Sequence, residues 1–479
     1  MPWDNVEAAL EAATAALNAC LCDEEAGLPV APEAYAAPAA ALSGLYAQLL
    51  AGGPEAYRLF AIEGQAEVRR LGHDQAVYAA LDTYRPAVKL TVDGQPLTWR
   101  NWKSYERACA GSATALQAGF DEVVAHSVHA TPALEARIEQ ARADYGAYGL
   151  TPVHTFAARE GLGVPELRAL LVRVGQAGQA AFKAAADRLS GQVFGRSAGP
   201  AELRGLYLNL MYAPGAPMFT AEAAVPEALA AFRRLGFALE AVTVDVEDRP
   251  RKYPGAFCWP VRVPGDVRVS VRTATAHHLV DMLYHELGHA VHFSGIDAGR
   301  SFLDRYWIAS GTHEVFSTLF EWLLAEPLFL EEQFGLNAAE VDQLLEFAAF
   351  KRLLTGAWLG AAALTVLDAW LEAQPWPVVE AAFAANMLAF TGVALPAGFA
   401  RLEPFTAALS IYPAGYVLAE ARLGHWLEHW RAQGGAAWWR SPAVVADIRA
   451  HVRAGGAVRW PAAWNEPPAA AGNPAARAP

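Results

Sequence analysis

Apolar residues recur at three- and four-residue spacing along most of this chain, and this pattern constrains its fold more than any other feature. Two stretches that show it are AYAAPAAALSGLYAQLLAG and PELRALLVRVGQAGQAAFKAAADRLSG, and Gly and Pro separate such segments from one another. The spacing places apolar side chains on one face of an α-helix. Much of the apolar content is alanine, a strong helix former. We therefore expect a mainly α protein in which residues 1–195 form helix after helix.

Two short stretches near the middle of the chain break this pattern. AVTVDVE alternates Val242, Val244 and Val246 with polar residues, and DVRVSVRT alternates valine with polar residues from Val267 to Val271. Such alternation is typical of β-strands with one buried face. The intervening DRPRKYPGAFCWPVRVPG is rich in Pro and Gly and is expected to be a long connection. We predict a small sheet at about residues 240–275, followed by helices from about Ala276.

Length, charge and composition exclude several classes of protein. A chain of 479 residues with 54% hydrophobic residues can form two or three packed units with substantial cores. A net charge of −13 argues against nucleic acid or an anionic membrane as a partner. The segment Leu353–Leu371 is apolar, but Asp368 interrupts it, so a buried helix is expected there and no membrane span.

The cysteines and the first residues indicate a cytoplasmic location. Cys20, Cys22, Cys109 and Cys258 form no C-x-x-C pair and are too few for a disulfide framework in a chain of this length. We expect all four to be reduced, as they are in the cytoplasm. The N-terminal residues lack the basic start of a secretory signal.

The stretch YHELGHAVHF contains two histidines with the spacing of metal ligands. His285 and His289 are four residues apart, so on a helix both imidazoles lie on one face and can bind one ion. Glu286 follows the first of them, where its carboxylate can reach a water molecule beside the metal. This is the H-E-x-x-H arrangement of zinc hydrolases, with Glu286 as the general base.

A catalytic zinc ion needs a third protein ligand, and the next helical segment supplies a candidate. Glu314 in IASGTHEVFSTLFEWLL lies 25 residues after His289, which leaves room for a turn and a second helix. We expect one Zn²⁺ per chain, bound by His285, His289 and Glu314. Glu321 shares the helical face of Glu314, either as a packing acid or as a group supporting the ligands. His313 points about 100° away from Glu314 and is not expected to bind the metal.

Three further histidines lie near the motif. His292 is three residues after His289 and is a candidate for supporting a ligand. For His277 and His278 we expect a polar helix start.

Several separate patterns in this region resemble the thimet oligopeptidase and oligoendopeptidase F family of zinc peptidases. The metal helix of that family has the form H-E-x-G-H-x-x-H, which Gly288 and His292 complete here. The third ligand of that family occurs in an E-x-x-S pattern, matched by Glu314 and Ser317. An upstream stretch resembles KYPGAFC, which begins at Lys252 and ends at Cys258. A tyrosine-rich stretch follows in the family, and here SIYPAGYVLAEA holds Tyr412 and Tyr416.

The resemblance implies a large helical zinc-peptidase fold with two halves around a deep substrate channel and a small β-sheet near the active site. Residues 1–195 would form the helical domain that covers the channel, and residues 196–460 the catalytic domain. Residues 461–479 are rich in Pro and Ala and are expected to be a disordered tail. In this family a tyrosine hydroxyl stabilises the oxyanion, a role for Tyr416 or Tyr412 here.

These observations predict a zinc-dependent oligoendopeptidase that cleaves internal bonds of short unfolded peptides. One alternative is a metallocarboxypeptidase resembling carboxypeptidase Taq, whose third-ligand segment also has the form of HEVFS. It would need a positive group for the substrate's C-terminal carboxylate. A second alternative is a silent helical binding protein clamped by zinc. The strand Val267–Val271 is expected to be an edge strand that pairs with a peptide, with Arg268 and Arg272 on its polar face.

Overall fold

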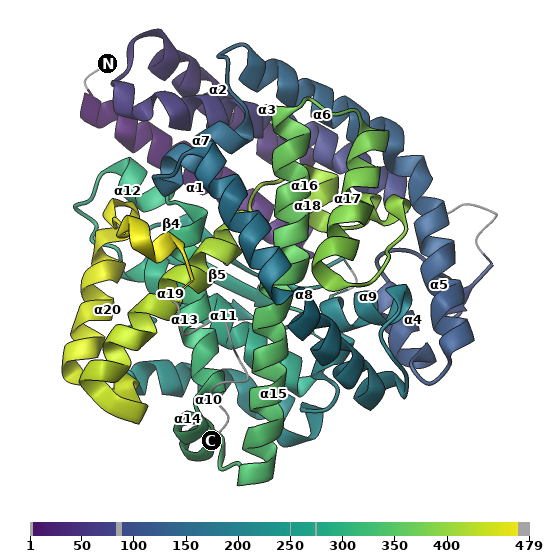
Figure 1. The fold of residues 1–479 in the computed structure, drawn as a ribbon. Coiled ribbons are helices and arrows are strands. Elements are labelled where there is room, and N and C mark those ends of the chain that lie inside the picture. Colours follow the sequence, from purple (N-terminus) through teal and green to yellow (C-terminus); the bar gives the residue numbers. More distant parts are fainter. Residues whose placement is uncertain (1–2, 83–88, 250, 274, 468–479) are drawn as a thin grey trace. The chain divides into compact units, whose positions relative to one another are not determined.

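The computed structural model describes residues 3–82, 89–249, 251–273 and 275–467. The fold is mainly α with small β-sheets, as expected from the helical spacing of the apolar residues (Figure 1). The chain forms two compact units. The first consists of Met1–Val68, Gly215–Ala348 and Leu418–Pro479, and the second consists of Arg69–Pro214 and Ala349–Val417. The expected division into residues 1–195 and 196–460 stays a prediction.

The first unit contains the HELGH segment and a three-stranded sheet. Its helices are α1 (Trp3–Glu25), α2 (Pro32–Gly52), α10 (Ala221–Arg234), α11 (Ala276–Gly295), α12 (Phe302–Tyr306), α13 (Ser310–Glu321), α14 (Pro327–Phe334) and α20 (Pro442–Ala454). Its strands are β3 (Val242–Asp245), β4 (Ala256–Arg262) and β5 (Asp266–Val271). Its core joins the buried face of β5 to the apolar faces of α11 and α13, and includes Leu283, Leu287 and Phe316.

The second unit is helical apart from one short hairpin. Its helices are α4 (Trp102–Cys109), α5 (Ala113–His126), α6 (Thr131–Gly146), α7 (Pro152–Glu160), α8 (Val164–Phe194), α9 (Pro200–Leu208), α16 (Gly360–Leu371), α17 (Trp376–Thr391) and α18 (Pro404–Ala408). The hairpin pairs β1 (Thr91–Val92) with β2 (Gln95–Pro96). Helices α3 (Arg58–Asp82), α15 (Ala338–Leu354) and α19 (Pro413–Gly434) each contain a boundary between the units.

The sheet of the first unit differs from the expected one in two respects. Its strand order is β3-β5-β4, with β3 parallel and β4 antiparallel to β5. Strand β5 is therefore central, and the expectation that it would be an edge strand is wrong. Strand β4 lies in the segment expected to be a connection. Alternation did not reveal β4 because most of its side chains are half-buried on both faces of the sheet.

Two other expectations concern the apolar helix and the end of the chain. Among the described residues, one helical stretch, Ala338–Leu371, is long and apolar enough to cross a membrane, and 72% of its most apolar window is buried in the protein. At the other end, Ala462–Asn465 form a short 3-10 helix in which Asn465 is buried. The folded chain therefore extends past residue 461, the expected start of the tail. Residues 468–479 of the expected tail lie outside the described residues.

Candidate metal centre

Helix α11 holds the two histidines of the HELGH segment on one face. It begins after Thr275, whose hydroxyl oxygen accepts a hydrogen bond from the N–H of His278 over 3.2 Å. This satisfies one of the free N–H groups at the helix start. One turn separates His285 from His289, and their ring centroids lie 5.0 Å apart. Helix α11 therefore presents both imidazoles together, as the four-residue spacing predicted.

Helix α13 brings Glu314 to these histidines because the two helices pack very closely. A Cβ atom on Gly288 would lie 2.6 Å from the carbonyl oxygen of Phe316, so only glycine fits at this crossing. Oε2 of the fully buried Glu314 lies 3.5 Å from Nε2 of His285 and 3.5 Å from Nε2 of His289. The structure thus brings the three predicted ligands together.

The geometry of this donor set fits a zinc ion. One ligand atom from each of His285, His289 and Glu314 can be chosen so that all three lie within 4.8 Å of one another. A tetrahedral zinc ion with bonds of about 2.0–2.2 Å holds its ligand atoms roughly 3.3–3.6 Å apart, close to the observed 3.5 Å. Two imidazoles and one carboxylate also match the ligand types of catalytic zinc sites, which leave one position open.

Two side chains of α13 fix the orientation of the ligands. Oε2 of Glu321 lies 2.8 Å from Nδ1 of His285, so the ring presents Nε2 toward Glu314. The hydroxyl group of Ser317 donates a hydrogen bond to Oε2 of Glu314 over 2.8 Å. Of the two roles left open for Glu321, the supporting role is the observed one. Ser317, known from the sequence only as part of a pattern, has the same function toward Glu314.

Burial and neighbouring charged groups shift the pKa values of His285 and His289 in opposite directions. Burial by itself lowers the pKa of His285, but the hydrogen bond to Glu321 and the charges of Glu314 and Glu286 raise it to about 9. Burial lowers the pKa of His289 well below its ordinary value, and the neighbouring histidines add to this effect. The carboxyl groups of Glu286, Glu314 and Glu321 thus all act on His285, and such a cluster of carboxyl groups favours a divalent cation.

His313 and His292 lie near the predicted ligands but do not belong to the ligand set. His313 is half-buried beside the site, with Nδ1 3.8 Å from Oε1 of Glu314, and it is outside the ligand set found among the described residues. His292 is fully buried and stacks on Phe316 with ring centroids 4.1 Å apart. Its ring nitrogens have no hydrogen-bond partner in the described part of the chain, so it packs between the helices and supports no ligand by hydrogen bonding.

His277 and His278 stand at the start of α11, as expected, and both side chains are buried. The ring of His277 stacks on Phe219 and lies edge-on to Phe347, with centroid distances of 5.3 Å and 4.6 Å.

The predicted general base lies beside strand β4. Glu286 is 6% exposed and follows the first ligand on α11. Cys258 pairs with Val269 across β4 and β5, so its side chain faces α11 together with the buried valines. Burial raises the pKa of the Cys258 thiol well above its usual value, and the negative charge of Glu286 raises it further. The middle of β4 therefore packs on the core that contains α11, the helix of Glu286.

The KYPGAFC stretch that suggested the oligopeptidase family has a structural role in the sheet. Nζ of the buried Lys252 donates hydrogen bonds to the carbonyl oxygens of Asp245 and Glu247 over 2.9 Å and 3.0 Å, and pairs with the Asp245 carboxylate at 3.2 Å. Burial lowers the pKa of Lys252, although the Asp245 charge opposes this. Lys252 thus joins the ends of β3 and β4 and lines up the strand that follows it.

Arg268 in β5 and Arg272, directly after the strand, are bound by carboxylates of the protein. Arg268 pairs with Asp266 at 2.9 Å and with Asp23 of α1 at 3.2 Å. Arg272 pairs with Asp248 at 2.7 Å. Arg268 alternates with the buried Val267 and Val269 along β5, so it is on the opposite face of the sheet, where it pairs with Trp259. Neither guanidinium group is thus left without a carboxylate partner.

Tyr416 is in the first turn of α19, and Tyr412 directly precedes this helix. Both belong to the second unit, whereas the three predicted metal ligands belong to the first. Both are half-buried, with ring centroids 5.5 Å apart, and both rings contact Phe405. Their role in catalysis stays a prediction.

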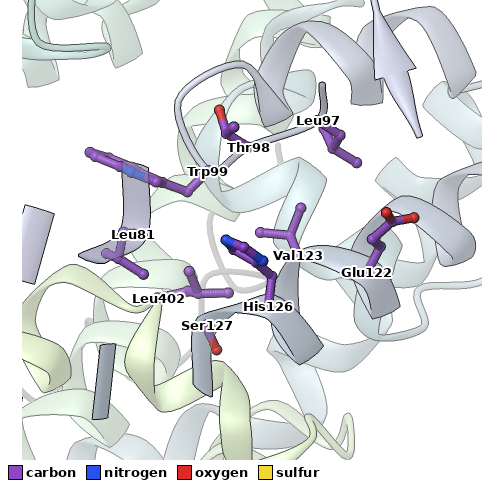
Figure 2. A pocket seen from close by; sticks show the side chains of 9 residues that line it. All are labelled: Leu81, Leu97, Thr98, Trp99, Glu122, Val123, His126, Ser127 and Leu402. Atoms are coloured by element: carbon purple, nitrogen blue, oxygen red, sulfur yellow. The ribbon is translucent and has the colours of Figure 1, made fainter. Parts of the chain in front are cut away.

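A pocket in the second unit offers no comparable chemistry. Figure 2 shows its lining, and its empty volume is about 250 Å³, which includes open solvent. The lining residues are Leu81, Leu97, Thr98, Trp99, Glu122, Val123, His126, Ser127 and Leu402. The Glu122 carboxylate already accepts a hydrogen bond from the N–H of Leu90 over 3.3 Å. The metal centre in the first unit is therefore the candidate functional site.

Comparison with known proteins shows a likeness at the level of the fold. No family model matches the chain, and no curated protein matches it in sequence. Among solved structures, a carboxypeptidase from Pyrococcus furiosus is similar with a TM-score of 0.55 and 15% identity, over 96% of this chain and 94% of that one. A protein described as CHT is similar over the same shares, with a TM-score of 0.55 and 14% identity. The chain thus has the same large helical fold as these two proteins over nearly its whole length.

Proposed function

We propose that this protein is a zinc-dependent peptidase that acts on short peptides. The observation that carries the proposal is the buried set of His285, His289 and Glu314, with Glu286 next to the first ligand on the same helix. Zinc bound there would act as a Lewis acid on the peptide carbonyl and would lower the pKa of the attacking water. The acidic balance of the chain and its four free cysteines support a cytoplasmic protein without nucleic acid or membrane partners.

The proton transfers fall to Glu286. Its carboxylate takes a proton from the attacking water and passes it to the leaving amine. Glu286 is buried, and electrostatic interactions of a buried carboxylate are stronger than those of an exposed one. Glu321 and Ser317 hold His285 and Glu314 in place during these steps. A hydroxyl group of Tyr416 or Tyr412 remains our candidate for a hydrogen bond to the oxyanion.

A peptide would bind along the outer edge of β4. The N–H of Arg272 donates a hydrogen bond to the carbonyl oxygen of Gly255 over 2.7 Å. This bond fixes the pattern of backbone hydrogen bonds between β4 and β5. Bonding residues alternate in an antiparallel pair, so the N–H and C=O groups of Ala256 and Cys258 point away from β5. Among the described residues, no further strand pairs with this edge. Backbone pairing there would bind peptides with little sequence preference.

We favour removal of residues from the C-terminus of the peptide over internal cleavage. The similarity of nearly the whole chain to a solved carboxypeptidase supports this choice. Internal cleavage is the second candidate. A carboxypeptidase needs a positive group for the substrate's C-terminal carboxylate, and Arg268 and Arg272 already pair with Asp266 and Asp248. A silent zinc-clamped binding protein is disfavoured because such a protein has no use for a buried carboxylate at position 286.

The test is a set of fluorogenic peptides with free and amidated C-termini, with products identified by mass spectrometry. The zinc-loaded protein should release single C-terminal residues from free peptides and leave amidated peptides intact. Cleavage of both at internal bonds would establish the endopeptidase instead. Glu286→Gln should lower the rate about a thousandfold or more while zinc stays bound. Glu331→Gln, the same change on the exposed surface of α14, should keep the full rate. Full activity of Glu286→Gln would refute the mechanism.

A further inference from the structure

The outer edge of β4 is shorter than the strand, because a side chain of α1 closes one end of it. Nδ2 of Asn18 donates a hydrogen bond to the carbonyl oxygen of Pro260 over 3.0 Å. Pro260 is next in the series of outward-pointing residues after Ala256 and Cys258, and as proline it has no N–H group. At Pro260, an incoming peptide therefore finds no N–H group, and the carbonyl oxygen there already accepts a hydrogen bond from Asn18.

Helix α1 also contacts the chain before the strand begins. The N–H of Tyr253 donates to the carbonyl oxygen of Glu25 over 2.7 Å. Between these two contacts, the outward groups of Ala256 and Cys258 make no hydrogen bond in the described part of the chain. Cys258 is also the residue of β4 that interacts with Glu286. Two residues with outward backbone groups thus remain between the two α1 contacts, and the side chain of Cys258 packs on the core formed with α11, the helix of the general base.

We infer that Asn18 is a specificity-determining residue that ends the peptide-binding edge at Cys258, so that a bound peptide pairs only with Ala256 and Cys258. The inference rests on the proposed peptidase function. In the wild type, two peptide N–H groups donate to β4, and these belong to residues two apart, since strand positions alternate. Without the Asn18 amide, the Pro260 oxygen accepts a third N–H, two residues further along the peptide.

The experiment measures backbone pairing directly with peptides in which an ester oxygen replaces one N–H at a time. Binding of each peptide to zinc-loaded Glu286→Gln protein is followed by calorimetry, so that no peptide is hydrolysed. With Asn18 present, two positions, two residues apart, should each lose about three- to tenfold in affinity. With Asn18→Ala, a third position two residues beyond them should become sensitive by a similar factor, and the parent peptide should bind more tightly.

Two further variants make the result specific to the hydrogen bond. Asn18→Asp keeps the shape of the side chain but has no N–H to donate, so it should behave like Asn18→Ala. Asn5→Ala, an exposed change on the same helix, should keep the wild-type pattern.

Identical sensitive positions with and without Asn18 would overturn the inference, as would the lack of any sensitive position in a protein that hydrolyses peptides. Failure of the proposed function would be seen in a separate measurement. In that case the zinc-loaded protein with Glu286 intact would not hydrolyse peptides.

Discussion

Two of the three predicted ligand side chains, His285 and Glu314, depend on a partner outside the HELGH segment. His285 is held by Glu321, and Glu314 by Ser317, both one or two turns further along α13. The four-residue histidine spacing specifies which face binds metal, but the ring orientations come from these second contacts. A site with both histidines and without these partners would bind zinc less tightly.

We expect Glu321→Gln to weaken zinc binding about ten- to a hundredfold, because an amide makes a weaker hydrogen bond to the imidazole and carries no charge. Competition with a zinc-binding dye measures the affinity. Glu331→Gln serves as the control for loss of one negative charge from the unit. Equal affinities for Glu321→Gln and the control would mean that Glu321 only packs in the helix interface.

For the tyrosines we expect that one of Tyr416→Phe and Tyr412→Phe lowers kcat about ten- to a thousandfold and changes KM less. A hydroxyl group that donates to the oxyanion bonds more strongly to the transition state than to the bound peptide, so its loss falls on kcat. Steady-state kinetics of both zinc-loaded variants decides between them. Wild-type kcat in both variants would exclude the two hydroxyl groups from transition-state stabilisation.

Among the elements, the close crossing of α11 and α13 controls the geometry of the site. Gly288 lies at the crossing, and the backbone of Phe316 and Ser317 occupies the space where a side chain would begin. Glu314 and Ser317 stand on the helix that would have to move. A larger residue at position 288 would therefore push α13 away and move Glu314, the predicted third ligand.

We expect Gly288→Ala to destabilise the protein by roughly 1–3 kcal/mol, the range for overpacking a tight contact, and to weaken zinc binding. Thermal unfolding and zinc titration measure the two effects. Gly335→Ala, a control at the end of α14, should reduce stability through its positive φ of 66° but leave zinc affinity unchanged. Unchanged zinc affinity in Gly288→Ala would mean that α13 can shift without moving Glu314.

At the scale of the molecule, the proposed zinc ligands lie on two different helices of the first unit. A metal ion that binds the folded unit and not the unfolded chain stabilises it by linkage. Removal of zinc with a chelator should lower the Tm by a few degrees, and readdition should restore it. His289→Ala, which lacks one ligand, should show a much smaller zinc-dependent change. A Tm that is independent of zinc in the wild type would argue against binding at this site.

Much of this protein was predictable from its sequence, because helix periodicity and the spacing of metal ligands are local properties. Apolar spacing predicted a mainly α fold, and the positions of His285, His289 and Glu314 predicted a ligand set that the structure brings together. The alternating valines of β3 and β5 predicted a sheet for the same reason, since strand alternation is read within a few residues.

What the sequence alone left undecided depends on contacts between distant segments. The choice between a packing and a supporting role for Glu321 needed the distance to His285 on another helix. The central position of β5 could not be predicted without β4, and β4 shows no alternation in sequence because its side chains are half-buried on both faces. Asn18 has no sequence signal at all, because its hydrogen bond joins residues 242 positions apart. Local patterns specify which elements form, whereas tertiary packing decides which of their side chains meet.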